Sequence, residues 1–168
     1  AGPNTSMAIK VDGTLWGWGP PNNGRLGLND NVKRSSPTQI PGTTWKDVAM
    51  THENDGGYVA IKTDGTMWAW GQGSTGQLGL NSTTQYSSPI QIPGTTWNTL
   101  GTGDYNGCCV RTDGTLWVWG HGAEGAIAQN NTSQYSSPKQ IPGTNWVKCE
   151  SFRYGAYATK SDGTLWAW

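Results

Sequence analysis

The feature that most constrains this chain is an octapeptide that occurs four times. The copy at residues 63–70 reads Thr-Asp-Gly-Thr-Met-Trp-Ala-Trp, and the others begin at Val11, Thr112 and Ser161. Asp-Gly between alternating apolar residues is the strongest short-range indication of a two-residue β-hairpin, because a type I′ turn needs positive φ at both central positions. The octapeptide therefore predicts four β-hairpins, each with Asp-Gly at its tip.

A two-residue turn also fixes which residues face one another across each hairpin. In the copy at 63–70, Ile61 is expected opposite Trp68, with Ala60 opposite Ala69 and Val59 opposite Trp70. Because successive side chains alternate between the two faces of a strand, each hairpin should have one bulky face and one slim face. Such hairpins would stack bulky face on slim face, so the sequence predicts β-sheets packed face to face.

The spacing of the octapeptides gives a repeat period. The tip aspartates at 12, 64, 113 and 162 are 52, 49 and 49 residues apart, and a second marker, Gln-Ile-Pro-Gly-Thr-Thr/Asn-Trp, begins 27 residues after each of the first three. A Gly/Asn/Ser-rich connection ends at Ser-Ser-Pro before this marker, a short strand follows (38–40 in the first copy), and another strand begins at the marker Trp. We therefore expect an all-β fold of four-stranded antiparallel units with a period of about 49–52 residues, which is typical of propeller blades.

These motifs resemble those of the regulator-of-chromosome-condensation repeat family. The resemblance rests on the hairpin octapeptide, on Gly-Gln-Leu-Gly-Leu at 76–80 and on Ser-Ser-Pro-x-Gln-Ile-Pro-Gly, at consistent spacing over the whole chain. It implies a β-propeller, commonly of seven blades with roughly fifty residues per repeat. The family often has His where this chain has Asn106 and Gly155, so interactions built on that His do not carry over.

We expect one propeller domain, with a partial blade at residues 1–18 and repeats at 19–70, 71–119 and 120–168. Three repeats and one hairpin cannot close a ring, since propellers use roughly four to eight blades. The sequence is therefore expected to be an excerpt of a longer chain that forms about seven blades. The alternative is a ring closed by several copies.

Charge and cysteine usage exclude several kinds of partner. The 11 basic and 11 acidic residues are spread along the chain, so there is no basic stripe for nucleic acid, and no apolar run is long enough for membrane insertion. Cys108, Cys109 and Cys149 occupy strand positions that hold other residues in the other copies, which predicts core packing. All eleven tryptophans belong to the repeat motifs and are also predicted to be core residues.

No residues have the spacing expected of an active site, and we predict no enzyme activity, no cofactor and no metal. Residues 71–76 and 120–125 match G-x-G-x-x-G, but no helix-forming segment follows to receive a pyrophosphate, so turn glycines are the better interpretation. His52, Glu53 and Asp55 could hold a metal in principle, although a solvated loop is favoured over a metal site.

The copies differ most in two sets of loops. The first set is 51–57, 102–107 and 151–155, and the second is 20–23, 72–75 and 121–124. In an antiparallel meander both sets emerge at the same end of the blade, opposite the Asp-Gly turns, and varied loops on a rigid scaffold are where recognition usually occurs. The predicted partner-binding residues are His52, Glu53, Asp104, Tyr105, Phe152, Arg153 and Tyr154.

The sequence therefore predicts a non-catalytic protein-binding or assembly module. Its neutral, tryptophan-rich repeats are similar to those of structural proteins of virions or of cell surfaces, so the compartment expected is extracellular or the virion surface. The expected partner is a protein or further copies of the chain. The alternative is a carbohydrate-binding propeller that contacts a glycan through Tyr105 and Tyr154.

Overall fold

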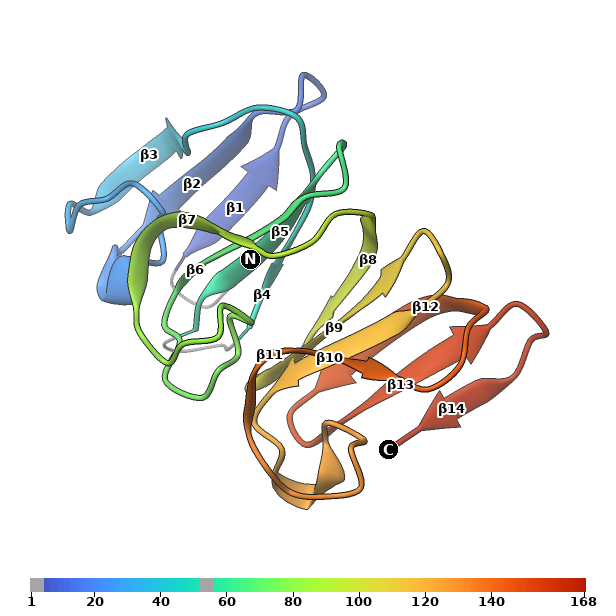
Figure 1. Cartoon of the computed structure of the whole chain (residues 1–168). Coiled ribbons are helices and arrows are strands. Elements are labelled where there is room, and N and C mark those ends of the chain that lie inside the picture. The colour runs from blue at the N-terminus through green and yellow to red at the C-terminus, as the bar shows by residue number, and fades with distance from the viewer. Residues whose placement is uncertain (1–4, 52–55) are drawn as a thin grey trace.

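Residues 5–51 and 56–168, which the computed structural model describes, form an all-β fold of four antiparallel sheets (Figure 1). The first sheet contains β1 (Ser6–Ile9), β2 (Leu15–Gly19) and β3 (Arg34–Gln39). The second contains β4 (Trp45–Met50), β5 (Tyr58–Lys62), β6 (Met67–Gly71) and β7 (Tyr86–Ile92). The third contains β8 (Trp97–Thr102), β9 (Asn106–Arg111), β10 (Leu116–Gly120) and β11 (Tyr135–Ile141). The fourth contains β12 (Trp146–Phe152), β13 (Gly155–Lys160) and β14 (Leu165–Ala167).

Each sheet is a meander in which consecutive strands pair, and the sheets follow one another from blue to red in Figure 1. Strand β8 contacts both β4 and β12 across the sheets, so the first strand of each of the second, third and fourth sheets lies innermost. The prediction of four-stranded antiparallel units is confirmed by the second and third sheets. The sheets begin at the marker tryptophans Trp45, Trp97 and Trp146, and are thus offset from the repeats counted from 19, 71 and 120.

The outermost strands begin earlier than the sequence suggested. In β3, β7 and β11 the Ser-Ser-Pro segment lies inside the strand rather than in the loop before it. Proline has no N–H for a ladder hydrogen bond, but an edge strand needs none on its open side. Two short 3-10 turns, η1 (Asn22–Gly24) and η2 (Ala123–Gly125), lie in the connections that precede β3 and β11.

The predicted two-residue turn is wrong, and with it the predicted register. Of residues 63–65, Gly65 alone has positive φ (+78°), and the Lys62 N–H donates to the Thr66 carbonyl at 2.9 Å. The loop therefore has three residues, a type I turn closed by a glycine bulge. The Asp64 carboxylate explains the choice, because its Oδ1 accepts from the N–H of Thr66 at 2.9 Å and from its Oγ1 at 2.7 Å.

The extra residue moves every cross-strand pair by one position. Trp68 faces Ala60, Ala69 faces Val59, and Trp70 faces Tyr58. The predicted assignment of residues to a bulky and a slim face is therefore wrong. One face carries the two tryptophans opposite mostly small residues, and the other is aliphatic.

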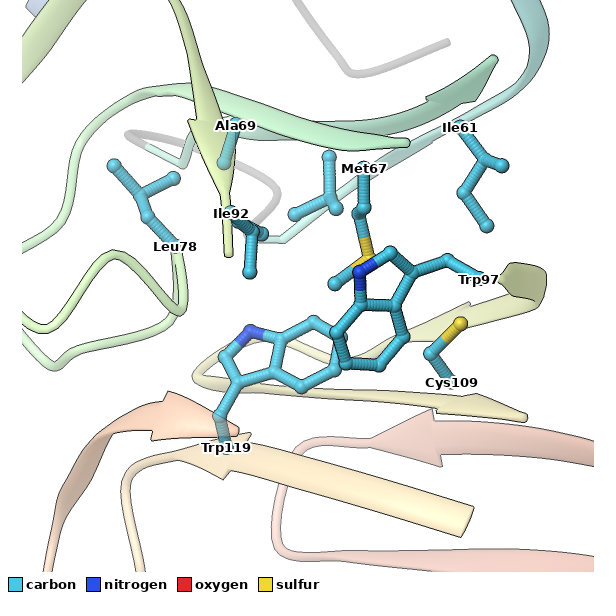
Figure 2. Close-up of a cluster of buried hydrophobic side chains, with 9 residues drawn as sticks. Ile61, Met67, Ala69, Leu78, Ile92, Trp97, Cys109 and Trp119 are labelled. Atoms are coloured by element: carbon cyan, nitrogen blue, oxygen red, sulfur yellow. The ribbon is translucent and has the colours of Figure 1, made fainter. Parts of the chain in front are cut away.

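Unlike faces nevertheless stack, as predicted, because the aliphatic face of one sheet packs on the tryptophan face of the next. Figure 2 shows this joint between the second and third sheets, where Trp97 and Trp119 meet Met67 and Ile92. Equivalent buried clusters fill the other two joints. The core is therefore divided into three layers, one for each pair of successive sheets.

The tryptophans are not all buried, which corrects the sequence prediction. Trp70 and Trp119 are 0% exposed, whereas Trp68 and Trp117 are half-buried and Trp166 is 51% exposed. The half-buried Trp68 donates from Nε1 to the Thr66 hydroxyl at 3.0 Å. Asp, Thr and the first Trp of each octapeptide thus form one hydrogen-bonded chain at the turn, and all four copies contain it.

A cation lies against the tryptophans beside these turns. The Arg111 guanidinium is 4.0 Å from the Trp97 ring centroid and 4.3 Å from that of Trp117, and burial lowers its pKa. Lys62 and Lys160 hold the same position between two tryptophans in the second and fourth sheets. The turn end is thus built from the same interactions in the second, third and fourth sheets, and in the first sheet Lys10 lies over Trp16.

Three equivalent loops fasten each sheet to the next, and we call residues 24–29, 76–81 and 125–130 the clasp loops. The first two read Gly-x-Leu-Gly-Leu-Asn, and the third reads Gly-Ala-Ile-Ala-Gln-Asn. The Trp119 Nε1 donates to the Gln77 carbonyl at 2.8 Å, and the Asn81 N–H donates to the Ser136 carbonyl at 2.6 Å. The first clasp loop makes the same two bonds to Trp70 and Ser87. Glycine is favoured at position 79, because φ there is +72° and an added Cβ would lie 3.2 Å from the Trp119 ring, although Ala128 takes the equivalent position of the third loop with a φ of +49°.

The three cysteines are buried and free, as predicted. Burial raises the pKa of Cys109 to about 12, and burial together with the neighbouring Cys108 raises the pKa of Cys149. Cys109 and Cys149 are therefore protonated at neutral pH, and all three cysteines are core residues. None of the described residues belongs to a helix with the length and apolar character needed to cross a membrane.

Candidate functional site

The loops in which the copies differ gather at one end of the sheets. The connections β8–β9 and β12–β13 lie at the same end as β6–β7 and β10–β11, because consecutive strands run antiparallel. The two loop sets touch directly, since the His121 N–H donates to the Tyr105 carbonyl at 2.9 Å. This loop end is opposite the Asp-Gly turns, as the sequence predicted.

Five of the seven predicted site residues lie together at this end. Asp104 and Tyr105 occupy the β8–β9 connection, Phe152 ends β12, and Arg153 and Tyr154 form the turn before β13. The other two, His52 and Glu53, lie outside the described residues. The site therefore spans the third and fourth sheets.

Contacts between the loops join equivalent positions of successive copies. Asp104 and Arg153 are 49 residues apart, and so are Tyr105 and Tyr154. The Arg153 Nε is 3.7 Å from the Asp104 Oδ2, and the guanidinium carbon is 5.1 Å from the Tyr154 ring centroid. A single repeat position has thus become acidic in one copy and basic in the next, and the two side chains meet.

Two further residues complete a small aromatic recess that the sequence did not single out. Thr75, Tyr105, His121 and Tyr154 line a hollow of about 220 Å³, and the Tyr105 and His121 rings meet edge to face at 6.1 Å. Thr75 and His121 lie in the varied segments 72–75 and 121–124, and that variation was the sequence feature that could have pointed to them. Their convergence with Tyr154 depends on how three successive sheets are placed.

A second hollow of about 320 Å³ is lined in part by the Asp104–Arg153 pair. It is lined by Met50, Thr102, Gly103, Asp104, Ser151, Phe152 and Arg153. Phe152 is 51% exposed and Tyr154 is 49% exposed. The loop end therefore presents two accessible aromatic rings with an arginine between them in sequence.

The aromatic and charged side chains of this surface suit non-covalent contact. Among the described residues, no three His, Cys, Asp or Glu side chains are grouped so as to hold a metal ion. Tyrosine and arginine are enriched among the residues that carry binding energy in protein interfaces. The surface is thus equipped for recognition through ring packing and one guanidinium.

The sequence signature of the regulator of chromosome condensation (RCC1) repeat matches residues 12–52 and 64–110. The chain belongs to this RCC1 repeat family. Among RCC1-type relatives, a mitochondrial RCC1 domain-containing protein of Arabidopsis thaliana, RUG3, is 35% identical over 89 residues, which is 52% of this chain and 20% of the relative. Human protein RCC2 (Homo sapiens) is 33% identical over 88 residues, or 52% of this chain and 17% of RCC2.

Solved RCC1-type propellers share the fold. Human WBSCR16 superposes with a TM-score of 0.86 at 20% identity, over 99% of this chain and 45% of that structure. Yeast RCC1 (Prp20), solved bound to Kap60, gives a TM-score of 0.80 at 17% identity, over 99% of this chain and 42% of that structure. The four sheets are therefore blades of an RCC1-type β-propeller, and the chain spans less than half the length of these relatives.

Proposed function

We propose that this chain is a non-catalytic protein-binding module whose binding surface is the loop end of the third and fourth blades. The observation that carries the proposal is the contrast between the two ends of the blades. At the turn end the same Asp-Thr-Trp chain recurs in all four sheets, whereas at the loop end Gly103 and Asp104 of the third blade are replaced by Phe152 and Arg153 in the fourth, where Phe152, Arg153 and Tyr154 are accessible. Uniform residues maintain the scaffold, and varied exposed residues suit recognition.

Solved relatives support a protein as the partner. Yeast RCC1 was solved bound to Kap60, and a second study of Prp20p from Saccharomyces cerevisiae describes its binding to Gsp1p and to histones. These partners belong to those proteins, and they support the general class of partner here. The neutral charge of this chain suits a structural protein of a virion or a cell surface, in a ring of about seven blades, as the setting for such binding.

One observation favours a second candidate, a carbohydrate-binding propeller. Tyr105, His121 and Tyr154 surround a recess, and aromatic rings around a hollow also suit the apolar face of a sugar. Retention of the protein on one class of sugar in a glycan array, abolished by Tyr154→Ala, would favour this candidate over protein binding.

The protein-binding proposal is tested with a loop-end variant and a matched control. Proteins captured from the source organism are purified and titrated against wild type, Tyr154→Ala and Tyr157→Ala, since Tyr157 is 42% exposed but lies on the sheet face of β13. We expect Tyr154→Ala to lower the affinity for the purified partner by about tenfold or more and Tyr157→Ala to leave that affinity unchanged.

The same variants are melted to separate binding from stability. Tyr154 is half exposed, so its truncation should move the thermal midpoint by no more than about 2 °C. Equal loss of binding in both variants, or a fall in the midpoint that parallels the loss, would contradict the proposal.

A further inference from the structure

The recess at the loop end has the size of one side chain. Its volume of about 220 Å³ is below the roughly 300–1,000 Å³ of pockets that bury a small molecule. Three of its four lining residues are rings, and they come from the third and fourth blades, while Thr75 comes from the second. A ligand that fills it must therefore offer a compact group that packs against rings.

Hydrogen bonds hold two walls of the recess in place. The Thr75 Oγ1 donates to the Gln77 Oε1 at 2.6 Å, and the Thr75 N–H donates to the same oxygen at 2.8 Å. The His121 N–H donates to the Tyr105 carbonyl at 2.9 Å, which ties the two loops of the third blade together. Because the recess is already formed, little conformational entropy of the protein is lost when a ligand fills it.

Arg153 places an accessible positive charge beside the recess. Its side chain is 59% exposed, and its 3.7 Å contact with Asp104 is longer than the roughly 2.7–2.9 Å of a charge-assisted hydrogen bond. The contact uses Nε, and the guanidinium carbon lies 5.1 Å from the ring centroid of Tyr154, so the charged group stands at the edge of the recess with its two terminal nitrogens outside the printed ion pair. They can take a carboxylate in the bidentate manner that arginine favours. Arg34 differs, since its terminal nitrogen already meets Asp30 at 2.6 Å.

We infer that the partner presents an extended segment with a prolyl ring next to an acidic residue. The ring enters the recess of Thr75, Tyr105, His121 and Tyr154, and the carboxylate pairs with Arg153. This inference rests on the proposed protein-binding function and specifies the chemistry of its partner. The occupant is a segment of another protein.

The conformational entropy that a ligand loses on binding favours proline over a larger side chain. A small open recess buries little apolar area, so the ligand that loses least freedom gains most from it. Proline has no side-chain entropy to lose, and its polyproline II backbone is preformed before binding. Aromatic-lined grooves in other recognition domains take proline-rich segments for the same reason.

Synthetic peptides test the inference directly. The probe is acetyl-Gly-Glu-Pro-Pro-Glu-Gly-amide, compared with one peptide in which Lys replaces both Glu residues and another in which Ala replaces both Pro residues. Each is titrated to millimolar concentration into the ¹⁵N-labelled protein. We expect backbone shifts at Tyr105, His121 and Tyr154, with the acidic proline peptide binding about tenfold more tightly than either comparison peptide.

Variants assign the two contacts. Tyr154→Ala should weaken the acidic proline peptide by about tenfold, and Arg153→Ala by about fivefold, since the pair with a carboxylate is partly exposed. Arg34→Ala is the control. It removes an arginine of the first blade, away from the recess, and should leave the affinity for the peptide unchanged. Arg153→Glu should reverse the preference, so that the lysine peptide binds more tightly than the glutamate peptide.

Three results would overturn the inference. These are no shifts at millimolar peptide, equal binding of the lysine or alanine peptide, or shifts away from the loop end. If a purified protein partner still depends on Tyr154 while the acidic proline peptide fails, the inference is wrong and the protein-binding function stands. If a glycan binds the recess in place of protein, both are wrong.

Discussion

The aspartate of each octapeptide determines the local structure of its turn. The Asp113 Oδ1 accepts from the Thr115 hydroxyl at 2.6 Å and from its N–H at 3.0 Å, and the same hydroxyl receives the Trp117 Nε1 at 2.9 Å. One carboxylate thus fixes the loop and the rotamer of a tryptophan. This explains why Asp, Thr and Trp recur together in every copy.

These carboxylates predict a loss of stability in acid. Hydrogen bonds from the Thr hydroxyl, then from the Thr N–H, lower the pKa of Asp12, Asp64, Asp113 and Asp162 below 3.8. Because the folded pKa lies below the unfolded one, the unfolded state binds more protons in acid. The stabilisation is therefore complete above the unfolded pKa and is lost as the pH falls through the folded pKa.

Urea unfolding between about pH 6 and pH 2.5 measures this effect. The free energy of unfolding should be nearly constant above about pH 5 and fall below about pH 4. Asp113→Asn removes one titrating group while keeping an acceptor oxygen, so its curve should fall less steeply in acid. Identical acid slopes for wild type and Asp113→Asn would contradict the role assigned to the turn.

Tryptophans at different positions of the repeat should differ in their effect on stability. Trp119 is fully buried in a joint between blades, so Trp119→Ala should cost about 3–5 kcal/mol of unfolding free energy. Trp166 is 51% exposed, and Trp166→Ala should cost less than about half of that. Chemical denaturation of both variants measures the difference, and equal losses would show that burial does not set the ranking.

At the scale of elements, the clasp loops join neighbouring blades. Each loop brings a backbone carbonyl to the second tryptophan of the next blade, at 2.9 Å for Trp70, 2.8 Å for Trp119 and 3.0 Å for Trp168. The first two loops also hold a serine of the next outer strand. Each blade is thus held to the next through an indole N–H, and in the first two joints through an edge strand as well.

Gly76 and Gly125 provide a matched pair for testing the clasp. They are equivalent residues with φ of +72° and +80°, so alanine costs both about 1–2 kcal/mol for the left-handed backbone. A Cβ on Gly76 would lie 2.8 Å from the Ser136 Cα, whereas a Cβ on Gly125 has no described atom within 4 Å. Gly76→Ala should therefore lose about 1–3 kcal/mol more than Gly125→Ala by chemical denaturation. Equal losses would mean that the clasp loop can move away from Ser136 without a measurable loss of unfolding free energy.

At the scale of the whole molecule, unlike faces drive the packing of successive blades. The aliphatic face of each of the first three blades receives the tryptophan face of its neighbour, and within residues 1–168 no described residue covers the corresponding face of the fourth blade. On that blade Leu165 is 67% exposed and Tyr157 is 42% exposed. Exposed apolar patches of this kind promote association.

Residues 1–168 are therefore expected to associate in solution. Sedimentation at about 10 μM should give a mass above the 18.0 kDa of one chain, and Leu165→Glu should lower it by placing a charge in the patch. Val32→Glu is the control, because Val32 is 57% exposed in a loop of the first blade. A soluble wild-type species of 18.0 kDa would contradict the expectation.

The sequence by itself determined the class of fold and the location of variation. Turn residues and alternation are local properties, so Asp-Gly-Thr and the marker tryptophans placed the strands and the 49–52-residue period. Because consecutive strands in such a sheet run antiparallel, the sequence also predicted that the varied loops lie at one end of the blades. Asp104, Tyr105, Phe152, Arg153 and Tyr154 could be named for that reason.

The tertiary structure decided what local pattern does not encode. The hairpin register followed from a carboxylate that bonds Thr66 in a three-residue loop, an energetic preference between two turns that Asp-Gly permits. Trp68 and Trp70 lie on the same face of β6, so their different burial followed from how the preceding blade covers that face along the strand. Asp104 meets Arg153, and His121 and Thr75 join Tyr154, because the rotation between successive blades brings their loops together, and no spacing along the chain specifies that rotation.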